Sequence, residues 1–297
     1  MRQAIPSLFL MIATITVIGQ DRREEFIKHL QAGDTTAQLA LLNRWEQEDP
    51  ENAELFTCYF NYYVARSRQE VLSLTQEQPE GESFSFQDST GKTAGYIGSD
   101  VMYNSKILQK GFDRIDKGIE LYPDRLDMRF GKIHVIGLTE DWDGFTEEII
   151  KAIRHSANNK NDWTWTNNEK KPEGKEFFLS GIQGYQMTLY NTGDDDLLQN
   201  MRTIAEETLK LHPDHVASLS NLSLTYLLTK DYDKGIEALL RAEKIDPTDA
   251  IVLSNIAQGY RLKGDKERAI DYYRKTIPHA DEDLKAFAEQ QIKELEK

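Results

Sequence analysis

Two phrases that end in proline, Leu209-Lys-Leu-His-Pro213 and Glu243-Lys-Ile-Asp-Pro247, decide the fold of this chain. Their prolines lie 34 residues apart, and similar phrases precede Pro50 and Pro123. Proline lacks a backbone N–H and disfavours helix in the residue before it, so a proline placed after a helical run ends the helix. Four of the eight prolines in the chain stand in this position. The shared spacing predicts a tandem array of helical hairpins.

The segment between Pro213 and Pro247 shows helical periodicity in two stretches, separated by a turn at residues 229–232. In each stretch apolar residues recur at the spacing of one helix face. They are Leu219, Leu222, Tyr226 and Leu227 in the first stretch, and Ile236, Leu239, Leu240 and Ala242 in the second. The same pattern follows Pro247, with a turn at Lys263-Gly264-Asp265. We therefore predict two consecutive helical hairpins in this part of the chain.

These two hairpins resemble the tetratricopeptide repeat (TPR) family, whose repeats carry bulky, small and aromatic residues in a set order and end in proline. Small residues stand where paired helices must approach closely, at Ser223, Gly235, Ala257 and Ala269. The resemblance implies an all-α fold, a right-handed TPR-like α-solenoid of about five helical hairpins with two loop insertions. The amphipathic stretch at 282–297 is expected to be a C-terminal capping helix that covers the last apolar face.

The sequence divides into four parts on this basis. They are a signal peptide at 1–19, degenerate N-terminal helical hairpins at 20–125, TPR-like hairpins at 126–213, and two clear repeats with the capping helix at 214–297. An insertion near 75–100 separates helices expected at Asn52–Leu74 and Met102–Leu121, and its alternating apolar residues predict a β-hairpin or an irregular flap. A second, polar insertion is expected near 156–174.

The first residues have the pattern of a secretory signal. Met1-Arg2-Gln3 is basic, the stretch Ala4–Gly19 is uncharged, and the first acidic residue is Asp21. This pattern predicts export from a bacterial cell, with cleavage after Gly19 and a periplasmic or secreted mature chain. The stretch is short for a membrane span, and an uncleaved N-terminal anchor is the alternative. After cleavage we expect no membrane span.

Composition argues against several classes of protein. There are 36 Lys and Arg against 50 Asp and Glu, a net charge of −14, which disfavours nucleic acid as a partner. The single cysteine, Cys58, excludes an internal disulfide and lies in an apolar run where a buried side chain is expected. His212 and His215 flank a predicted solvated turn and lack the helical spacing of a zinc site. We find no catalytic or metal-ligating pattern, so we expect neither an enzyme nor a cofactor.

The resemblance also implies that the first helix of each hairpin lines a concave groove that binds a peptide or protein segment. Asn221 and Asn255 are one repeat apart on this helix face, and an Asn amide both donates to and accepts from an extended peptide. The alternative is that these amides serve packing between hairpins. By helical phase, the groove residues are Ala217, Ser220, Asn221 and Leu224 in one repeat and Ile251, Ser254, Asn255, Gln258 and Arg261 in the next. We therefore predict a non-catalytic scaffold in the bacterial envelope, with a protein or peptide as its partner.

Trp163 and Trp165 favour an alternative function. In an extended segment the two rings lie on one face, where they could stack on a sugar or another small ligand. The chain would then be a carbohydrate- or small-ligand-binding accessory protein. In the other interpretation, the two rings anchor a long loop onto neighbouring helices.

Overall fold

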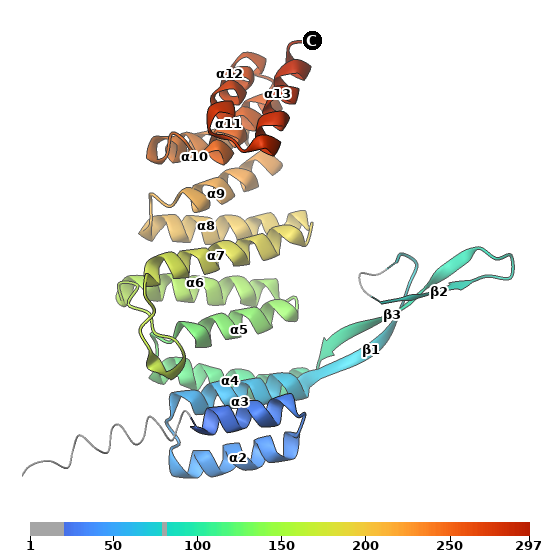
Figure 1. The fold of residues 1–297 in the computed structure, drawn as a ribbon, viewed down its shortest axis with the longest axis vertical. Helices are drawn as coiled ribbons and strands as arrows, with labels where there is room; N and C mark the ends of the chain where they lie inside the picture. The colour runs from blue at the N-terminus through green and yellow to red at the C-terminus, as the bar shows by residue number, and fades with distance from the viewer. Residues whose placement is uncertain (1–20, 79–81) are drawn as a thin grey trace, which may run out of the picture. The chain divides into compact units, whose positions relative to one another are not determined.

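A computed structural model describes residues 21–78 and 82–297, and the expected signal peptide at 1–19 lies outside the described residues. The chain forms two compact units. The first comprises the residues up to Asp141 together with Asp162–Pro172, and the second comprises Trp142–Asn161 and Glu173–Lys297. Within each unit, helices that follow one another along the chain pack side by side (Figure 1). The predicted all-α, TPR-like solenoid is confirmed.

The first unit contains helices and one small antiparallel sheet. Residues 21–31 are helical. The elements that follow are α2 (Thr35–Glu48), α3 (Ala53–Ser67), β1 (Arg68–Thr75), β2 (Phe84–Gln87), β3 (Thr93–Tyr103), α4 (Ser105–Leu121), α5 (Leu126–Leu138) and the short 3-10 helix η1 (Thr166–Asn168). The helices bury two apolar clusters, one around Trp45 and Tyr59 and the other around Phe60 and Ile115. Cys58 is free and buried in the first cluster, as expected.

The second unit is helical throughout. Its elements are α6 (Trp142–Asn158), α7 (Gly174–Asn191), η2 (Asp195–Leu197), α8 (Leu198–Leu211), α9 (Val216–Leu228), α10 (Tyr232–Ile245), α11 (Ala250–Lys263), α12 (Lys266–Thr276), η3 (Ile277–His279) and α13 (Glu282–Leu295). The polar insertion expected near 156–174 is the segment 159–173, which connects α6 to α7 and contains the short helix η1.

The four prolines end helices as the sequence predicts. α2, α4, α8 and α10 each end two residues before a proline, at Glu48, Leu121, Leu211 and Ile245. A different device joins α11 to α12. Gly264 takes a left-handed backbone conformation with φ +88°, which glycine adopts without strain, and the Asp265 carboxylate accepts a hydrogen bond from the Arg268 N–H at the start of α12. The proline turns connect successive hairpins, and the turn at Gly264 and Asp265 lies within one hairpin.

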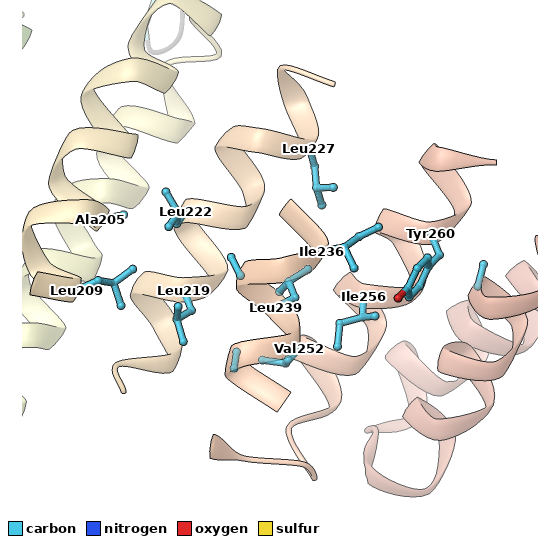
Figure 2. Close-up of a cluster of buried hydrophobic side chains, with 13 residues drawn as sticks. Ala205, Leu209, Leu219, Leu222, Leu227, Ile236, Leu239, Val252, Ile256 and Tyr260 are labelled. Atoms are coloured by element: carbon cyan, nitrogen blue, oxygen red, sulfur yellow. The ribbon is translucent and has the colours of Figure 1, made fainter. Parts of the chain in front are cut away.

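The predicted core of the repeats is buried. Leu219, Leu239 and Ile256 are fully enclosed between α8, α9, α10 and α11 (Figure 2). Gly235 lets α10 approach α9 closely, because a Cβ there would lie 2.8 Å from the Leu227 Cγ. At the end of the chain, Ala288 of α13 packs with Ala257 and Tyr273, so α13 covers the last apolar face as a capping helix.

The helix expected at Asn52–Leu74 is too long, because α3 ends at Ser67. Arg68–Thr75 is instead the strand β1, which pairs antiparallel with β3, and β3 also pairs with β2 to give the order β1-β3-β2. The insertion is thus a three-stranded sheet that leads away from the ends of α3 and α4 (Figure 1). A hydrogen bond of 2.8 Å from the Asn104 N–H to the Ser67 carbonyl closes its base.

Candidate functional site

A pocket in the second unit lies between α7 and the turn that joins α8 to α9. Its volume is about 510 Å³. One wall comes from α7 and the other from the proline-containing turn and the first residues of α9. The lining residues are Lys175, Glu176, Leu179, Ser180, Gln183, Leu211, His212, Pro213, Asp214, His215 and Ala217. The pocket therefore combines aliphatic surface with amide, hydroxyl, imidazole and charged groups.

The proline turn positions both histidines. α8 ends at Leu211, and the His215 N–H donates to the His212 carbonyl at 3.1 Å, which folds the chain back toward α9. The Nδ1 atom of His215 lies 2.8 Å from the Ser218 hydroxyl in the first turn of α9. The proline turn at Pro213 ends α8 as the other proline turns end their helices. Here the turn also places the imidazole rings of His212 and His215 against α7.

Burial lowers the pKa of both His212 and His215, and the positive charge of Lys175 lowers both further. Both rings are therefore neutral near pH 7. The Nε2 atom of His212 is shielded from solvent and has no hydrogen-bond partner within the described residues. The wall of the pocket is therefore a mixed apolar and polar surface.

Asn221 does not point its amide into an empty groove. Its Nδ2 donates to the Gln183 Oε1 at 2.5 Å, and the Gln183 Nε2 donates back to its Oδ1 at 3.4 Å. Asn221 is 9% exposed. The amide joins α9 to α7, so at this position the structure shows the packing alternative, and Gln183 is the residue of the pair that lines the pocket.

The remaining predicted groove residues differ in how open they are. Leu224, Ser220 and Asn255 are half-buried, whereas Ser254 is buried. The Gln258 Oε1 accepts from the Tyr273 hydroxyl at 2.9 Å and from the exposed Arg261 Nε at 3.0 Å. The Gln258 side chain is therefore already bonded within the hairpin formed by α11 and α12.

Ala217 and Ile251 are the predicted groove residues nearest the pocket end of the two first helices. They occupy equivalent positions one repeat apart, in the first turns of α9 and α11. Ala217 lines the pocket, and the side chain of Ile251 is 65% exposed. The open part of the predicted face is therefore at the beginning of these helices.

Trp163 cannot stack on a ligand, because it is fully buried. Trp165 is half-buried, with its ring edge-on to Phe130 at a centroid distance of 6.5 Å and Lys171 above it at 5.3 Å. The structure thus shows the anchoring interpretation: the two tryptophans hold the loop at 162–172 within the first unit.

A buried ion-pair cluster holds the same loop. Arg125 pairs with Glu54 at 2.7 Å and with Asp127 at 2.8 Å, and its Nη1 donates to the Asn168 Oδ1 at 3.1 Å. The Asn167 N–H donates to Glu54 at 2.8 Å. Every charged group in this cluster has a partner, so we assign it a structural role.

Sequence reasoning missed most of the pocket. It treated the two histidines as a solvated turn, whereas both are partly buried against α7. It did not identify Leu179 and Gln183, because the sequence repeat that contains α7 differs in length from its neighbours.

In the described ranges 21–78 and 82–297, no group of three His, Cys, Asp or Glu side chains is placed to hold a metal ion. Over the same ranges, no helix has the length and apolarity that crossing a bilayer requires.

A comparison with protein families identifies one segment. The tetratricopeptide repeat family model matches residues 216–249, which span α9, α10 and the proline turn after them. This segment matches one tetratricopeptide repeat. The match coincides with the first of the two predicted TPR hairpins, and a comparison with curated proteins found no match.

A comparison with solved structures found matches at low sequence identity and low TM-score. YrrB, described as a TPR protein with an unusual peptide-binding site, is 14% identical with a TM-score of 0.42, and the match covers 84% of this chain and 97% of that chain. PilW, described as a type IV pilus biogenesis factor, is 10% identical with a TM-score of 0.40 and coverages of 91% and 98%. A thermophilic TPR protein from Thermus thermophilus is 14% identical with a TM-score of 0.32 and coverages of 92% and 98%.

Proposed function

We propose that this chain is a non-catalytic TPR scaffold that binds an extended segment of a partner protein on the first-helix face of its second unit. The observation that carries the proposal is the pocket between α7 and the α8–α9 turn, with Ala217 in its wall and the exposed Ile251 one repeat further along. Equivalent positions on stacked hairpins form a line, and a line of contacts suits an extended peptide.

The chemistry of the pocket favours a peptide over a small charged ligand. Leu179, Leu211 and Pro213 supply apolar wall, while Ser180 and Gln183 supply polar groups. A peptide offers both features in every residue, since each has backbone polar groups and a side chain. No geometric observation supports the carbohydrate alternative, because the ring of Trp163 is enclosed.

Site-specific crosslinking followed by binding measurements tests this proposal. A photoreactive amino acid at Ile251 should crosslink to one segment of a partner in the native host, and a synthetic peptide of that segment should bind the purified chain. Ile251→Ser should weaken this binding about tenfold, since it removes an exposed aliphatic contact. Ala217→Arg should weaken it as well, because the longer side chain fills the pocket.

Ile245 provides the matched control. It is an exposed isoleucine of the preceding repeat, 41% exposed, but it lies at the end of a second helix, α10. Ile245→Ser should leave the peptide affinity unchanged. Equal effects of the two serine variants, or crosslinks formed equally from both positions, would show that the first-helix face is not the binding surface.

We also propose that the scaffold acts after export, in the envelope or outside the cell. The support is the basic start and uncharged stretch at Ala4–Gly19. Mass spectrometry of the chain isolated from its host should show a mature N-terminus at Gln20, whereas a chain that retains Met1 in the cytoplasm would overturn the assignment.

A further inference from the structure

The sheet of the first unit has one apolar face. Leu74, Ile97 and Phe84 are register partners across the three strands, and residues directly opposite one another in antiparallel strands point to the same side. Residues two or four positions along a strand share that side. The apolar residues of this face are Leu72, Leu74, Phe84, Phe86, Ile97 and Val101, and Glu70, the register partner of Val101, lies on the same side near the helices.

In the described part of the chain, nothing covers this face. Leu72, Phe84 and Leu74 are 83%, 78% and 73% exposed. Sheets in soluble proteins usually pack their apolar face on a core, and a contiguous exposed patch of large apolar side chains marks an interaction surface.

The strand at one edge of the sheet, β1, is open to pairing. It runs for eight residues in unbroken register with β3, and it contains no proline, lysine or bulge. Proteins commonly use such features to protect an edge strand from pairing with another chain. The other edge strand, β2, has only four residues and a register shift between Phe86 and Gln87. β1 is therefore the edge that can accept a further strand.

The charge around the sheet is negative. Among its described residues the acidic side chains outnumber the basic ones, and Arg68 is already paired with Glu70 at 2.8 Å. The acidic residues are Glu70, Glu77, Glu82, Asp88 and Asp100, and the basic residues are Arg68 and Lys92. This surface attracts a basic segment and repels an acidic one.

A second copy of this chain fits the surface poorly. Two copies bring the same acidic excess together. Three strands about 4.8 Å apart and a few alternate positions along them give a face of roughly 300 Å². Two such faces bury roughly 600 Å², well under the roughly 1,200 Å² of a stable interface.

We propose that the β1 edge binds an extended, basic segment of a partner protein by adding it as a fourth strand. Backbone hydrogen bonds to β1 supply affinity. Alternate apolar side chains of the added strand then lie beside Leu72 and Leu74 and extend the apolar face, while Lys or Arg residues face the acidic surroundings. This surface shares no residue with the α7–α9 pocket, so the two proposals stand or fall separately.

Labelled synthetic peptides of about ten residues test the backbone part of this inference. The probe carries Val and Leu at alternate positions with Lys and Thr between them, and binding to the purified chain is followed by fluorescence anisotropy. Two derivatives carry N-methyl groups on either the odd or the even residues. Only one edge of an added strand faces β1, so one derivative should lose at least about tenfold in affinity and the other should bind like the parent.

Two further peptides test the pattern and the charge. A peptide of the same composition with its apolar residues in adjacent pairs should bind at least about tenfold more weakly. Replacing Lys by Glu should abolish binding, and added salt should weaken binding of the parent peptide.

Serine variants of the sheet test its location. Leu72→Ser with Leu74→Ser removes apolar neighbours of the added strand and should weaken binding. Phe84→Ser removes an equally exposed residue of the same face, but from β2, about 10 Å from β1, and should have little effect.

Several results would overturn the proposal. Both N-methylated peptides could bind equally, the Glu peptide could bind as well as the Lys peptide, or Phe84→Ser could weaken binding as much as the double variant. A dimer that the double variant converts to a monomer in light scattering would identify a second copy as the occupant. Sedimentation with vesicles of phosphatidylglycerol that depends on Leu72 and Leu74 would identify a membrane instead.

Discussion

Arg125 and Glu54 form an ion pair of 2.7 Å in which the two side chains are only 1% and 5% exposed. Arg125 precedes α5, Glu54 lies in the first turn of α3, and the loop at 162–172 closes over both. Removing one member of a buried ion pair is costly, because the remaining charge loses a partner at a site that water does not reach.

Glu54→Ala is expected to destabilise the first unit by about 1–3 kcal/mol, because Arg125 loses one of its two carboxylate partners and keeps Asp127. The matched control is Glu70→Ala, which breaks the pair between Arg68 and Glu70 at a similar distance but on an exposed surface, and should cost less than about 1 kcal/mol. Urea unfolding followed by circular dichroism measures both. The structural role assigned to the buried pair is wrong if both variants unfold at the wild-type midpoint.

Gly235→Ala should destabilise the second unit by about 1–2 kcal/mol, although alanine favours helix over glycine by about 1 kcal/mol. The added Cβ would lie 2.7 Å from the Leu227 Cδ2, and Leu227 is packed in the core. Gly184→Ala in α7 is the control, because no atom lies within 4 Å of a Cβ there, and it should stabilise the chain by about 0.5–1 kcal/mol. Stabilisation of similar size in both variants would contradict the close approach of α9 and α10.

The second unit should become less stable as the pH falls below about 6.5, the ordinary pKa of histidine. Burial and Lys175 hold the pKa values of His212 and His215 below that value in the folded chain. In this window the unfolded chain binds protons that the folded chain does not, so the free energy of unfolding decreases toward acid. Urea midpoints at a series of pH values measure the slope, and His212→Gln should flatten it. An unchanged slope in that variant would rule out His212 as a contributor.

Trp163→Ala should cost about 3–5 kcal/mol in the first unit, because it empties a fully buried site. Trp165→Ala removes a half-buried ring and its contact with Phe130, and should cost less than about 2 kcal/mol. Thermal unfolding of the two variants gives the comparison. The anchoring role of Trp163 would be contradicted by a smaller effect there than at Trp165.

The parts of the fold that follow local rules could be predicted from the sequence. A proline stops a helix wherever it stands, and Gly264 with Asp265 forms a turn from the conformational preferences of those two residues. The strand β1 could not be placed in this way. Arg68–Thr75 contains no helix breaker, and it becomes a strand by pairing with β3, more than twenty residues away.

The candidate site was harder to predict than the fold, because it also depends on contacts between segments that are distant in the sequence. The helical phase put Ala217 and Ile251 on the first-helix face, and in the structure Ala217 lines the pocket and Ile251 is exposed. It could not show that the Asn221 amide is taken by Gln183, or that His212 and His215 lie against α7, because both depend on a helix whose repeat is degenerate in sequence.

The junction between helices and sheet in the first unit has a mechanical consequence. No residue separates α3 from β1, and a single residue, Asn104, separates β3 from α4. With the hydrogen bond from Asn104 to Ser67 at its base, the sheet continues the helical pair without a flexible linker. Eight residues of strand extend for about 27 Å. A partner strand bound along β1, as proposed above, would therefore lie up to one strand length from the end of α3.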